Sequence, residues 1–168
     1  MLHNFKQSLQ ASFDHADDPI WREIYTKAFP NFNEMSCVKN DGWAQRGGID
    51  RVIVLESGKT ITVDEKVRPD KDYGDILLEY WSDEKKKVRG WVAKDLACDY
   101  IAYAVLPSRK CYLIPFLQLR LAWKNNCNEW VKTYKRVEAK NINYLTVSVP
   151  IPVDILFSAI KDSMKVEF

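Results

Sequence analysis

The sequence contains Gly47-Gly48-Ile49-Asp50-Arg51-Val52-Ile53-Val54-Leu55, then Glu56-Ser57-Gly58-Lys59, then Thr60-Ile61-Thr62-Val63-Asp64-Glu65-Lys66-Val67. The first run is mostly apolar, which is typical of a strand buried on both faces. The second run alternates polar and apolar residues, which is typical of a strand with one face on the core. Because a glycine-containing turn separates the runs, we expect residues 49–55 and 60–67 to pair as an antiparallel hairpin.

Alternation along the second strand assigns its side chains to two faces. Asp64 and Lys66 share one face, and the apolar residues share the other, which faces the core. Glu65 falls on the core face, where its charge requires either a partner such as Arg68 or a place at the sheet edge. The remaining alternative is a pairing shifted by one residue, which would turn every side chain over. Asp50 opens the first strand, so the hairpin places it roughly opposite Asp64.

These residue types suit a divalent metal ion. Two carboxylates held close together repel each other, and a bound cation removes that repulsion. Mg²⁺ prefers oxygen ligands, often one or two carboxylates completed by water and substrate phosphate. Asp50 and Asp64 are therefore candidate ligands for Mg²⁺ or Mn²⁺, and the backbone carbonyl of Glu65 is another. A metal there would polarise a phosphate and acidify a water, which Lys66 would orient or assist by stabilising the transition state.

The hairpin resembles the PD-(D/E)xK superfamily of restriction-endonuclease-like nucleases. The resemblance rests on Gly48-Ile49-Asp50 entering one strand and on Asp64-Glu65-Lys66 on the next strand. It also includes a helix before these strands and a strand, a helix and a strand after them, and it covers a core of about residues 19–106. Ile49 stands where the superfamily name has proline.

The resemblance implies a fold and a set of roles. Asp50 and Asp64 would be metal ligands, and Lys66 would be the catalytic lysine. Members often carry a further acid on the first core helix, and Glu23 is the matching residue here. The implied fold is α+β (α/β-like), with a mixed central β-sheet flanked by helices and an extra C-terminal strand and helices. The implied reaction is hydrolysis of a phosphodiester, with DNA as the expected substrate and a phosphate left on one product end.

Two alternatives stay open for charged residues in these strands. Glu79 lies inside the apolar run 76–81, where an ionised carboxylate needs a partner. It is either a fourth acid of the site or the ion-pair partner of Arg51. For the hairpin acids and lysine, the alternative to a metal site is a solvated strand face with cross-strand ion pairs. The paired glycines before Asp50 and the apolar residues around it favour the metal site.

Periodicity and turn signals outside the hairpin complete an α+β pattern. The strand at 75–81 would extend the hairpin into a three-strand meander, and two further strands would form a second hairpin around residues 107–108. The expected elements are helices over 2–13, 19–28, 90–98, 116–124, 129–137 and 153–164, strands over 75–81, 99–106, 110–115 and 144–149, and a loop over 31–47.

Composition limits the class of protein. The chain has 168 residues, which suggests a single domain. Its net charge of +2 is too small to indicate a general affinity for nucleic acid. The N-terminal residues contain no apolar signal-peptide core, and no run is long enough to cross a membrane, so we expect a cytoplasmic protein. The cysteines show no metal-binding spacing and are expected to be buried free thiols; they are Cys37, Cys98, Cys111 and Cys127.

Two local segments are basic enough to contact a nucleic-acid backbone. The first is the connection containing Lys85, Lys86, Lys87 and Arg89, for which the alternative is an ordinary solvated loop. The second begins at Lys124 and mixes bases with aromatic residues that would either stack on nucleic-acid bases or pack in the core at helical spacing; the aromatic residues are Trp123, Trp130 and Tyr134.

The sequence therefore predicts a small Mg²⁺- or Mn²⁺-dependent nuclease acting on nucleic acid, with a role in repair, recombination, a phage or a mobile element. Many relatives cut both strands as dimers, so a homodimer is possible. One alternative is a catalytically inactive binding module that keeps the fold. Another is a protein-interaction module whose aromatic helices present an exposed apolar patch.

Overall fold

The computed structural model describes residues 19–161 and 163–168. The expected helix over 2–13 lies outside the described residues. The chain divides into two compact units, each made of segments that are separated in the sequence. One unit holds the described residues 19–72, 95–116 and 163–168, and the other holds residues 73–94 and 117–161. Helices and a mixed sheet together make the architecture α+β.

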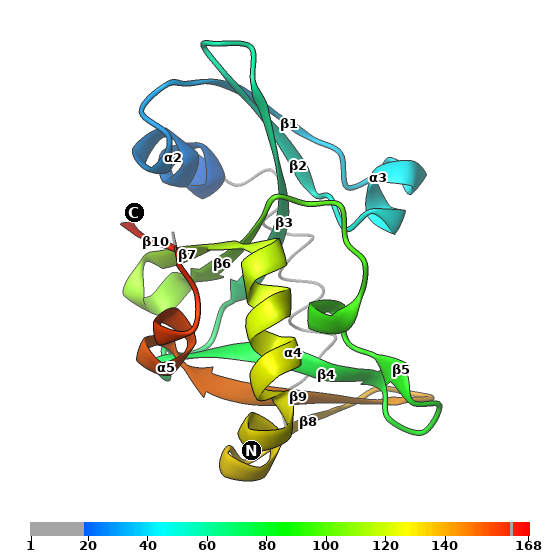
Figure 1. Ribbon diagram of the computed structural model, residues 1–168. Coiled ribbons are helices and arrows are strands. Elements are labelled where there is room, and N and C mark those ends of the chain that lie inside the picture. Colours follow the sequence, from blue (N-terminus) through cyan, green and yellow to red (C-terminus); the bar gives the residue numbers. More distant parts are fainter. Residues whose placement is uncertain (1–18, 162) are drawn as a thin grey trace. The chain divides into compact units, whose positions relative to one another are not determined.

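The first unit is built on a six-stranded sheet with the order β1-β2-β3-β6-β7-β10. Strands β3 and β6 run parallel, and every other neighbouring pair in this sheet is antiparallel, so the sheet is mixed. Figure 1 shows these elements in their sequence colours. Their bounds are α2 (Pro19–Ala28), β1 (Phe32–Cys37), α3 (Gly42–Arg46), β2 (Arg51–Leu55), β3 (Thr60–Arg68), β6 (Tyr100–Val105), the 3-10 turn η2 (Leu106–Ser108), β7 (Lys110–Pro115) and β10 (Met164–Glu167).

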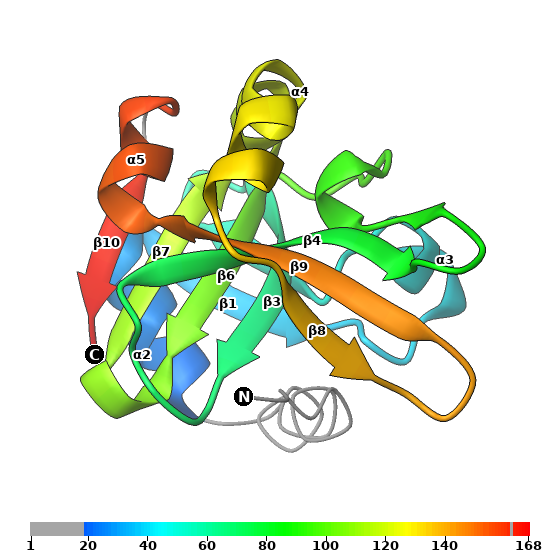
Figure 2. The same ribbon diagram turned by 90° about the horizontal axis from the view of Figure 1, so that it is seen from below.

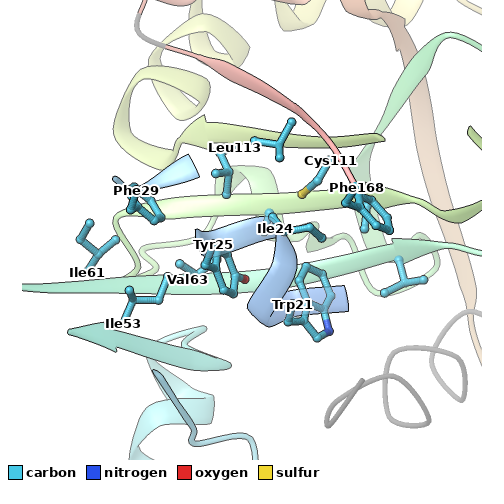
Figure 3. Close-up of a cluster of buried hydrophobic side chains, with 14 residues drawn as sticks. Trp21, Ile24, Tyr25, Phe29, Ile53, Ile61, Val63, Cys111, Leu113 and Phe168 are labelled. Atoms are coloured by element: carbon cyan, nitrogen blue, oxygen red, sulfur yellow. The ribbon is translucent and has the colours of Figure 1, made fainter. Parts of the chain in front are cut away.

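Helix α2 covers one face of this sheet through large buried side chains. Trp21, Ile24 and Tyr25 follow helical spacing, and each is fully buried. Figure 3 shows these three residues in one buried cluster with Val63 of β3 and Leu113 of β7. The core of the unit therefore lies between α2 and the face of β3 that carries its odd-numbered residues.

The second unit is built on a four-stranded sheet with the order β5-β4-β9-β8, in which all neighbours are antiparallel. Figure 2 shows β4 beside β9, although about sixty residues separate the two strands in the chain. The elements are β4 (Asp75–Asp83), β5 (Val88–Arg89), the 3-10 turn η1 (Trp91–Ala93), the helix α4 (Phe116–Thr133) from Leu117 onward, β8 (Val137–Lys140), β9 (Leu145–Pro152) and α5 (Val153–Ser158).

Several expected elements are confirmed. The hairpin of 49–55 and 60–67 is present as β2 and β3, with Arg51 paired to Val63 in antiparallel register. The expected pairing of 99–106 with 110–115 is present as β6 and β7, joined by η2. The helix after Asp18 is also present, and it ends at Ala28, two residues before the proline that was expected to stop it.

Other expectations are wrong. Residues 31–47 are not a loop, because they form the strand β1 and the short helix α3. The strand over 75–81 does not extend the hairpin, because β4 pairs with β5 and β9 in the other sheet. The third strand of the meander is instead β1, which pairs with β2.

Three predicted helices also need correction. The helices over 116–124 and 129–137 are one continuous helix, α4, and the residues from 137 onward form β8. Asn126 lies within α4, and its side-chain amide donates to the carbonyl of Ala122 one turn earlier at 2.8 Å. The segment 90–98 contains only the turn η1, and the helix expected over 153–164 ends at Ser158. No helix among the described residues has the length and apolar character needed to span a membrane.

Candidate functional site

The hairpin of β2 and β3 brings Asp50 and Asp64 together. The backbone N–H of Asp50 donates to the carbonyl of Val63 at 2.9 Å, directly beside the register pair of Arg51 and Val63. The register of β2 with β3 ends at that pair, so this bond holds Asp50 beside Val63, the residue that precedes Asp64. The two carboxyl groups interact, because the charge of Asp50 and a hydrogen bond with it both raise the pKa of Asp64.

Asp64 is a buried acid beside a lysine. Its burial raises its pKa to about 6, and Asp50 adds to that rise, while the neighbouring Lys66 acts in the opposite direction. The ammonium group of Lys66 forms a hydrogen-bonded ion pair with the carboxylate of Asp64. Asp64 is nearly inaccessible, whereas the Lys66 side chain keeps 29% of its exposure and so reaches solvent. Both side chains therefore lie on one face of β3, as the alternation predicted.

Asp50 also fixes the main chain of β3. One of its carboxylate oxygens accepts a hydrogen bond of 2.8 Å from the backbone N–H of Glu65. The N–H and the carbonyl of one strand residue face the same neighbouring strand. The carbonyl of Glu65 is therefore directed to the same side of β3 as Asp50.

Glu65 lies on the core face, as the alternation predicted, and its charge is met by buried partners. Its carboxylate accepts from Nε of Arg51 at 2.5 Å and from Oη of Tyr25 at 3.0 Å. It also forms an ion pair of 3.2 Å with Nζ of Lys39. The expected partner Arg68 is not the one found; the cations that bind Glu65 are Arg51 and Lys39. The pairing is not shifted by one residue.

Sequence reasoning missed this set of partners. Lys39 and Tyr25 come from segments that pairing rules for a hairpin do not connect to Glu65. Arg51 follows Asp50 directly, and a basic residue inside the apolar run of β2 was the one signal that an acid would lie nearby.

Two further polar residues lie beside the site. The carboxylate of Asp99 accepts from the backbone N–H of Thr62 at 2.7 Å and from its hydroxyl at 3.0 Å. Cys98 precedes Asp99 and is buried; burial first, and the negative charge of Asp64 second, raise the pKa of its thiol to about 12. Cys98 is therefore a neutral thiol near the acid pair, and its position between β3 and the start of β6 could not be read from the sequence.

Two glycines determine the conformation of the chain segment that leads into Asp50. Gly48 adopts φ +65°, a left-handed conformation that favours glycine, and an added Cβ would lie 2.8 Å from Cδ2 of Leu96. The carbonyl of Gly47 accepts a hydrogen bond of 2.7 Å from the N–H of Ala97. The segment before β6 thus packs directly against the chain that leads into Asp50.

Glu23 and Glu79 have other partners. Glu23 lies on α2, where ion pairs with Lys27 at 2.8 Å and Arg109 at 3.3 Å lower its pKa. Glu79 belongs to the other unit, and its carboxylate accepts from Oγ of Ser82 at 2.5 Å and from the N–H of Trp91 at 3.2 Å. Arg51, the alternative partner considered for Glu79, binds Glu65 instead.

The predicted nucleic-acid contacts all lie in the second unit and are exposed; they are Lys85, Lys86, Lys87, Arg89 and Lys124. Nζ of Lys87 lies 5.3 Å from the ring centre of Trp81. The aromatic residues of α4 are not a stacking surface, because Trp123 and Trp130 are each only 5% exposed and pack in the core. Trp123 and Trp130 are thus not the exposed residues that the interaction-module alternative expected, and its third residue, Tyr134, is half-buried.

The donor set suits a hard divalent cation. Two interacting carboxylates, one with a raised pKa, are groups that a cation would deprotonate and neutralise. Within the described part of the chain, acidic, histidine and cysteine side chains form no group of three or more arranged to hold a metal. Mg²⁺ commonly uses one or two protein carboxylates and takes its other ligands from water, carbonyl oxygen and substrate phosphate. Asp50, Asp64 and the Glu65 carbonyl fit that pattern.

Comparison of the chain with protein-family models, with curated proteins and with solved structures gave no match. The geometry of the hairpin is therefore the basis for any functional conclusion.

Proposed function

We propose that this chain is a metal-dependent nuclease with a PD-(D/E)xK-type site, which hydrolyses phosphodiester bonds of nucleic acid, with DNA as the first substrate to test. One observation carries the proposal. Asp50 and Asp64 meet at the end of a hairpin, and burial together with Asp50 raises the pKa of Asp64 to about 6. A pair of acids held in this way is destabilised when both are ionised, and a divalent cation removes the cost.

The order of elements around the hairpin supports a restriction-endonuclease-like core. Helix α2 precedes the hairpin, and the strands that carry the acids lie inside a mixed sheet. After β3 the chain passes through β4 and the turn η1 before it returns as β6, parallel to β3. The resemblance implies a strand, a helix and a strand at this place; here the three-residue turn η1 stands in place of the helix, and β4 and β5 belong to the other sheet.

The chain's own residues take the following roles in this proposal. Asp50 and Asp64 hold Mg²⁺ or Mn²⁺, and the carbonyl of Glu65 adds an oxygen ligand. The bound metal supplies a polarised phosphate and a more acidic water. Lys66 carries the positive charge among these groups, and its partial exposure lets it orient that water or stabilise the charge that develops on the phosphate. Asp64 is fully ionised only above about pH 6, which favours activity at neutral and alkaline pH.

Contacts to the nucleic-acid backbone are proposed for the exposed cations of the second unit, Lys85, Lys86, Lys87, Arg89 and Lys124. Such contacts neutralise phosphates and make binding depend on salt. Each charge reversal there is expected to weaken binding without changing metal affinity.

One observation favours the inactive binding module as a second candidate. The ion pair of Lys66 and Asp64 neutralises the buried acid without a metal. If Lys66 serves only that purpose, the chain binds nucleic acid but has no metal-dependent chemistry.

The test uses titration calorimetry with Mn²⁺ and Mg²⁺, followed by incubation of the same samples with plasmid and single-stranded DNA. Asp64→Asn removes the central ligand, and Glu56→Gln is the matched control because it changes an exposed acid at the opposite end of the same hairpin. We expect metal binding and cleavage in the wild type and in Glu56→Gln, and loss of both in Asp64→Asn. Wild-type protein that binds metal and DNA without cutting any substrate would favour the inactive module, and wild-type protein that binds no metal would overturn the proposal.

A further inference from the structure

The backbone pairing of β2 with β3 ends where the acid pair begins. The register pairs run from Val54 with Thr60 to Arg51 with Val63, and residues 64–66 have no register partner in β2. On their other side, these residues continue in register with β6. Beyond the backbone bond from Asp50 to Val63, the contacts that hold the acid-bearing segment to Asp50 and Arg51 are made by side chains.

Two consecutive residues of the first strand bind Glu65 from opposite faces of the sheet. On one face, the carboxylate of Asp50 accepts from the backbone N–H of Glu65 at 2.8 Å. On the other face, the guanidinium of Arg51 binds both oxygens of the Glu65 carboxylate, at 2.5 Å and 3.3 Å. A bidentate contact of this kind fixes orientation as well as distance.

Two more elements bind the same carboxylate. Tyr25 donates its hydroxyl from α2, and Lys39 brings its ammonium group from the turn before α3. The backbone carbonyl of Lys39 accepts a hydrogen bond of 2.5 Å from the side chain of Gln45 in α3, which orders that turn. Glu65, Arg51, Lys39 and Tyr25 are at most 6% exposed, so solvent does not compete for these bonds.

We infer that Glu65 is a positioning residue, whose carboxylate holds residues 64–66 in register with Asp50 so that the two acids present a preformed cation site. This inference rests on the proposed function, because it concerns the same metal site. Buried ion pairs are weak contributors to stability, and apolar residues of similar volume often replace them without loss. A buried charged network is better explained by conformational specificity, in which it selects one backbone arrangement among several. Here the end of the hairpin beyond the last register pair is the segment whose arrangement the network would select.

The test separates positioning from stability. The triple variant Lys39→Met/Arg51→Met/Glu65→Leu replaces the charged network with apolar side chains and leaves Asp50, Asp64 and Lys66 in place. Arg22→Met/Glu34→Leu is the matched control, because it removes an exposed ion pair of the same unit. Mn²⁺ affinity is measured by calorimetry on each protein, and kcat and KM are measured on DNA at a temperature where circular dichroism shows every variant to be folded.

We expect the triple variant to remain folded, to bind Mn²⁺ at least tenfold more weakly, and to lose about a hundredfold in kcat with little change in KM, since misplacing a reacting group by about 1 Å has costs of that order. A folded triple variant with wild-type Mn²⁺ affinity would overturn the inference. If the triple variant does not fold, Glu65→Gln decides, because it keeps the side-chain shape and one acceptor oxygen: weaker Mn²⁺ binding supports positioning, and unchanged binding overturns it.

The two proposals fail in different ways. Wild-type protein that binds Mn²⁺ but cuts no nucleic acid would remove the proposed function, while Mn²⁺ affinity of the variants would still decide the role of Glu65. Wild-type activity that persists in the triple variant would remove only the positioning role. Wild-type protein without Mn²⁺ affinity would overturn both.

Discussion

The carboxylate of Asp50 accepts a hydrogen bond of 2.8 Å from the backbone N–H of Glu65, two residues beyond Val63 of the last register pair of β2 and β3. This bond replaces the backbone pairing that has ended, and it directs the Asp50 carboxylate toward the face of Asp64. The acid pair therefore forms at the point where the backbone pairing of β2 with β3 ends. Its properties can be tested without a substrate.

The raised pKa of Asp64 predicts how stability depends on pH in metal-free buffer. The folded state holds this proton up to about pH 6, whereas the unfolded chain releases it near 3.8. The folded state therefore binds more protons between these values, and the free energy of unfolding must fall as pH rises from about 4 to about 6. Two pKa units correspond to at most about 3 kcal/mol.

Urea denaturation of the wild type and of Asp64→Asn across this range measures the effect. The difference in unfolding free energy between the two proteins should shift steadily in favour of Asp64→Asn as pH rises, and then become constant above about pH 6. Parallel curves for the two proteins would show that Asp64 titrates normally. Saturating Mn²⁺ should abolish the pH trend in the wild type alone, because the metal stabilises the ionised acid.

Gly48 is predicted to be required for the entry into Asp50. Alanine at φ +65° costs about 1–2 kcal/mol in backbone conformation alone, and its Cβ would meet Leu96 at 2.8 Å. Gly58→Ala is the control, because Gly58 has φ +79° with no atom within 4 Å of an added Cβ. Thermal unfolding should show a larger loss for Gly48→Ala than for Gly58→Ala. Equal losses would mean that Leu96 moves aside without cost.

The hairpin and its acid pair were predictable because both depend on residues close together in the chain. The turn at 56–59 sets the register, and strict alternation from Thr60 to Val67 assigns the faces. Strand β3 runs over Thr60–Arg68, close to the predicted 60–67. The approach of Asp50 to Asp64 was predicted from these two facts, although the register itself ends at Arg51 with Val63.

The missed parts depend on distant residues or on weak local patterns. Strand β1 reads Phe-Asn-Glu-Met-Ser-Cys; it lies at the sheet edge, pairs only with β2 and buries no residue fully, so its sequence has no apolar alternation. Strand β4 looked like a continuation of the hairpin, but its partner β9 begins at Leu145, and no local signal selects a partner so far along the chain. The partners of Glu65 were missed for the same reason, since Tyr25 precedes it by forty residues.

Gly90 is predicted to be the glycine of the second unit that tolerates substitution least. A Cβ there would lie 1.7 Å from the backbone carbonyl oxygen of Glu79, and a backbone atom in a sheet cannot move aside as a side-chain tip can. Gly90→Ala should lower the free energy of unfolding by about 3 kcal/mol or more. Gly42→Ala is the control, since nothing lies within 4 Å of its added Cβ and alanine suits the first turn of α3.

Chemical denaturation of both glycine variants provides the measurement. Gly42→Ala should be as stable as the wild type or more stable by up to about 1 kcal/mol. A Gly90→Ala protein of wild-type stability would show that β4 and the turn η1 do not approach as closely as described.

Lys66 is predicted to separate metal binding from chemistry. Its ammonium group pairs with Asp64 and lowers the pKa of that acid, so it competes with any cation for the same carboxylate. Because Lys66 lowers the pKa of Asp64, the comparison is made at a pH high enough to ionise Asp64 in both proteins, where Lys66→Met should bind Mn²⁺ as tightly as the wild type or more tightly. Cleavage of DNA should nevertheless fall by about 10²–10³-fold, the usual cost of removing one group that stabilises transition-state charge.

Lys59→Met, which removes an exposed lysine from the turn of the same hairpin, should change neither Mn²⁺ affinity nor the rate of DNA cleavage. Calorimetry and single-turnover cleavage on the three proteins provide the test, and loss of Mn²⁺ affinity in Lys66→Met would assign Lys66 to the integrity of the site rather than to the reaction.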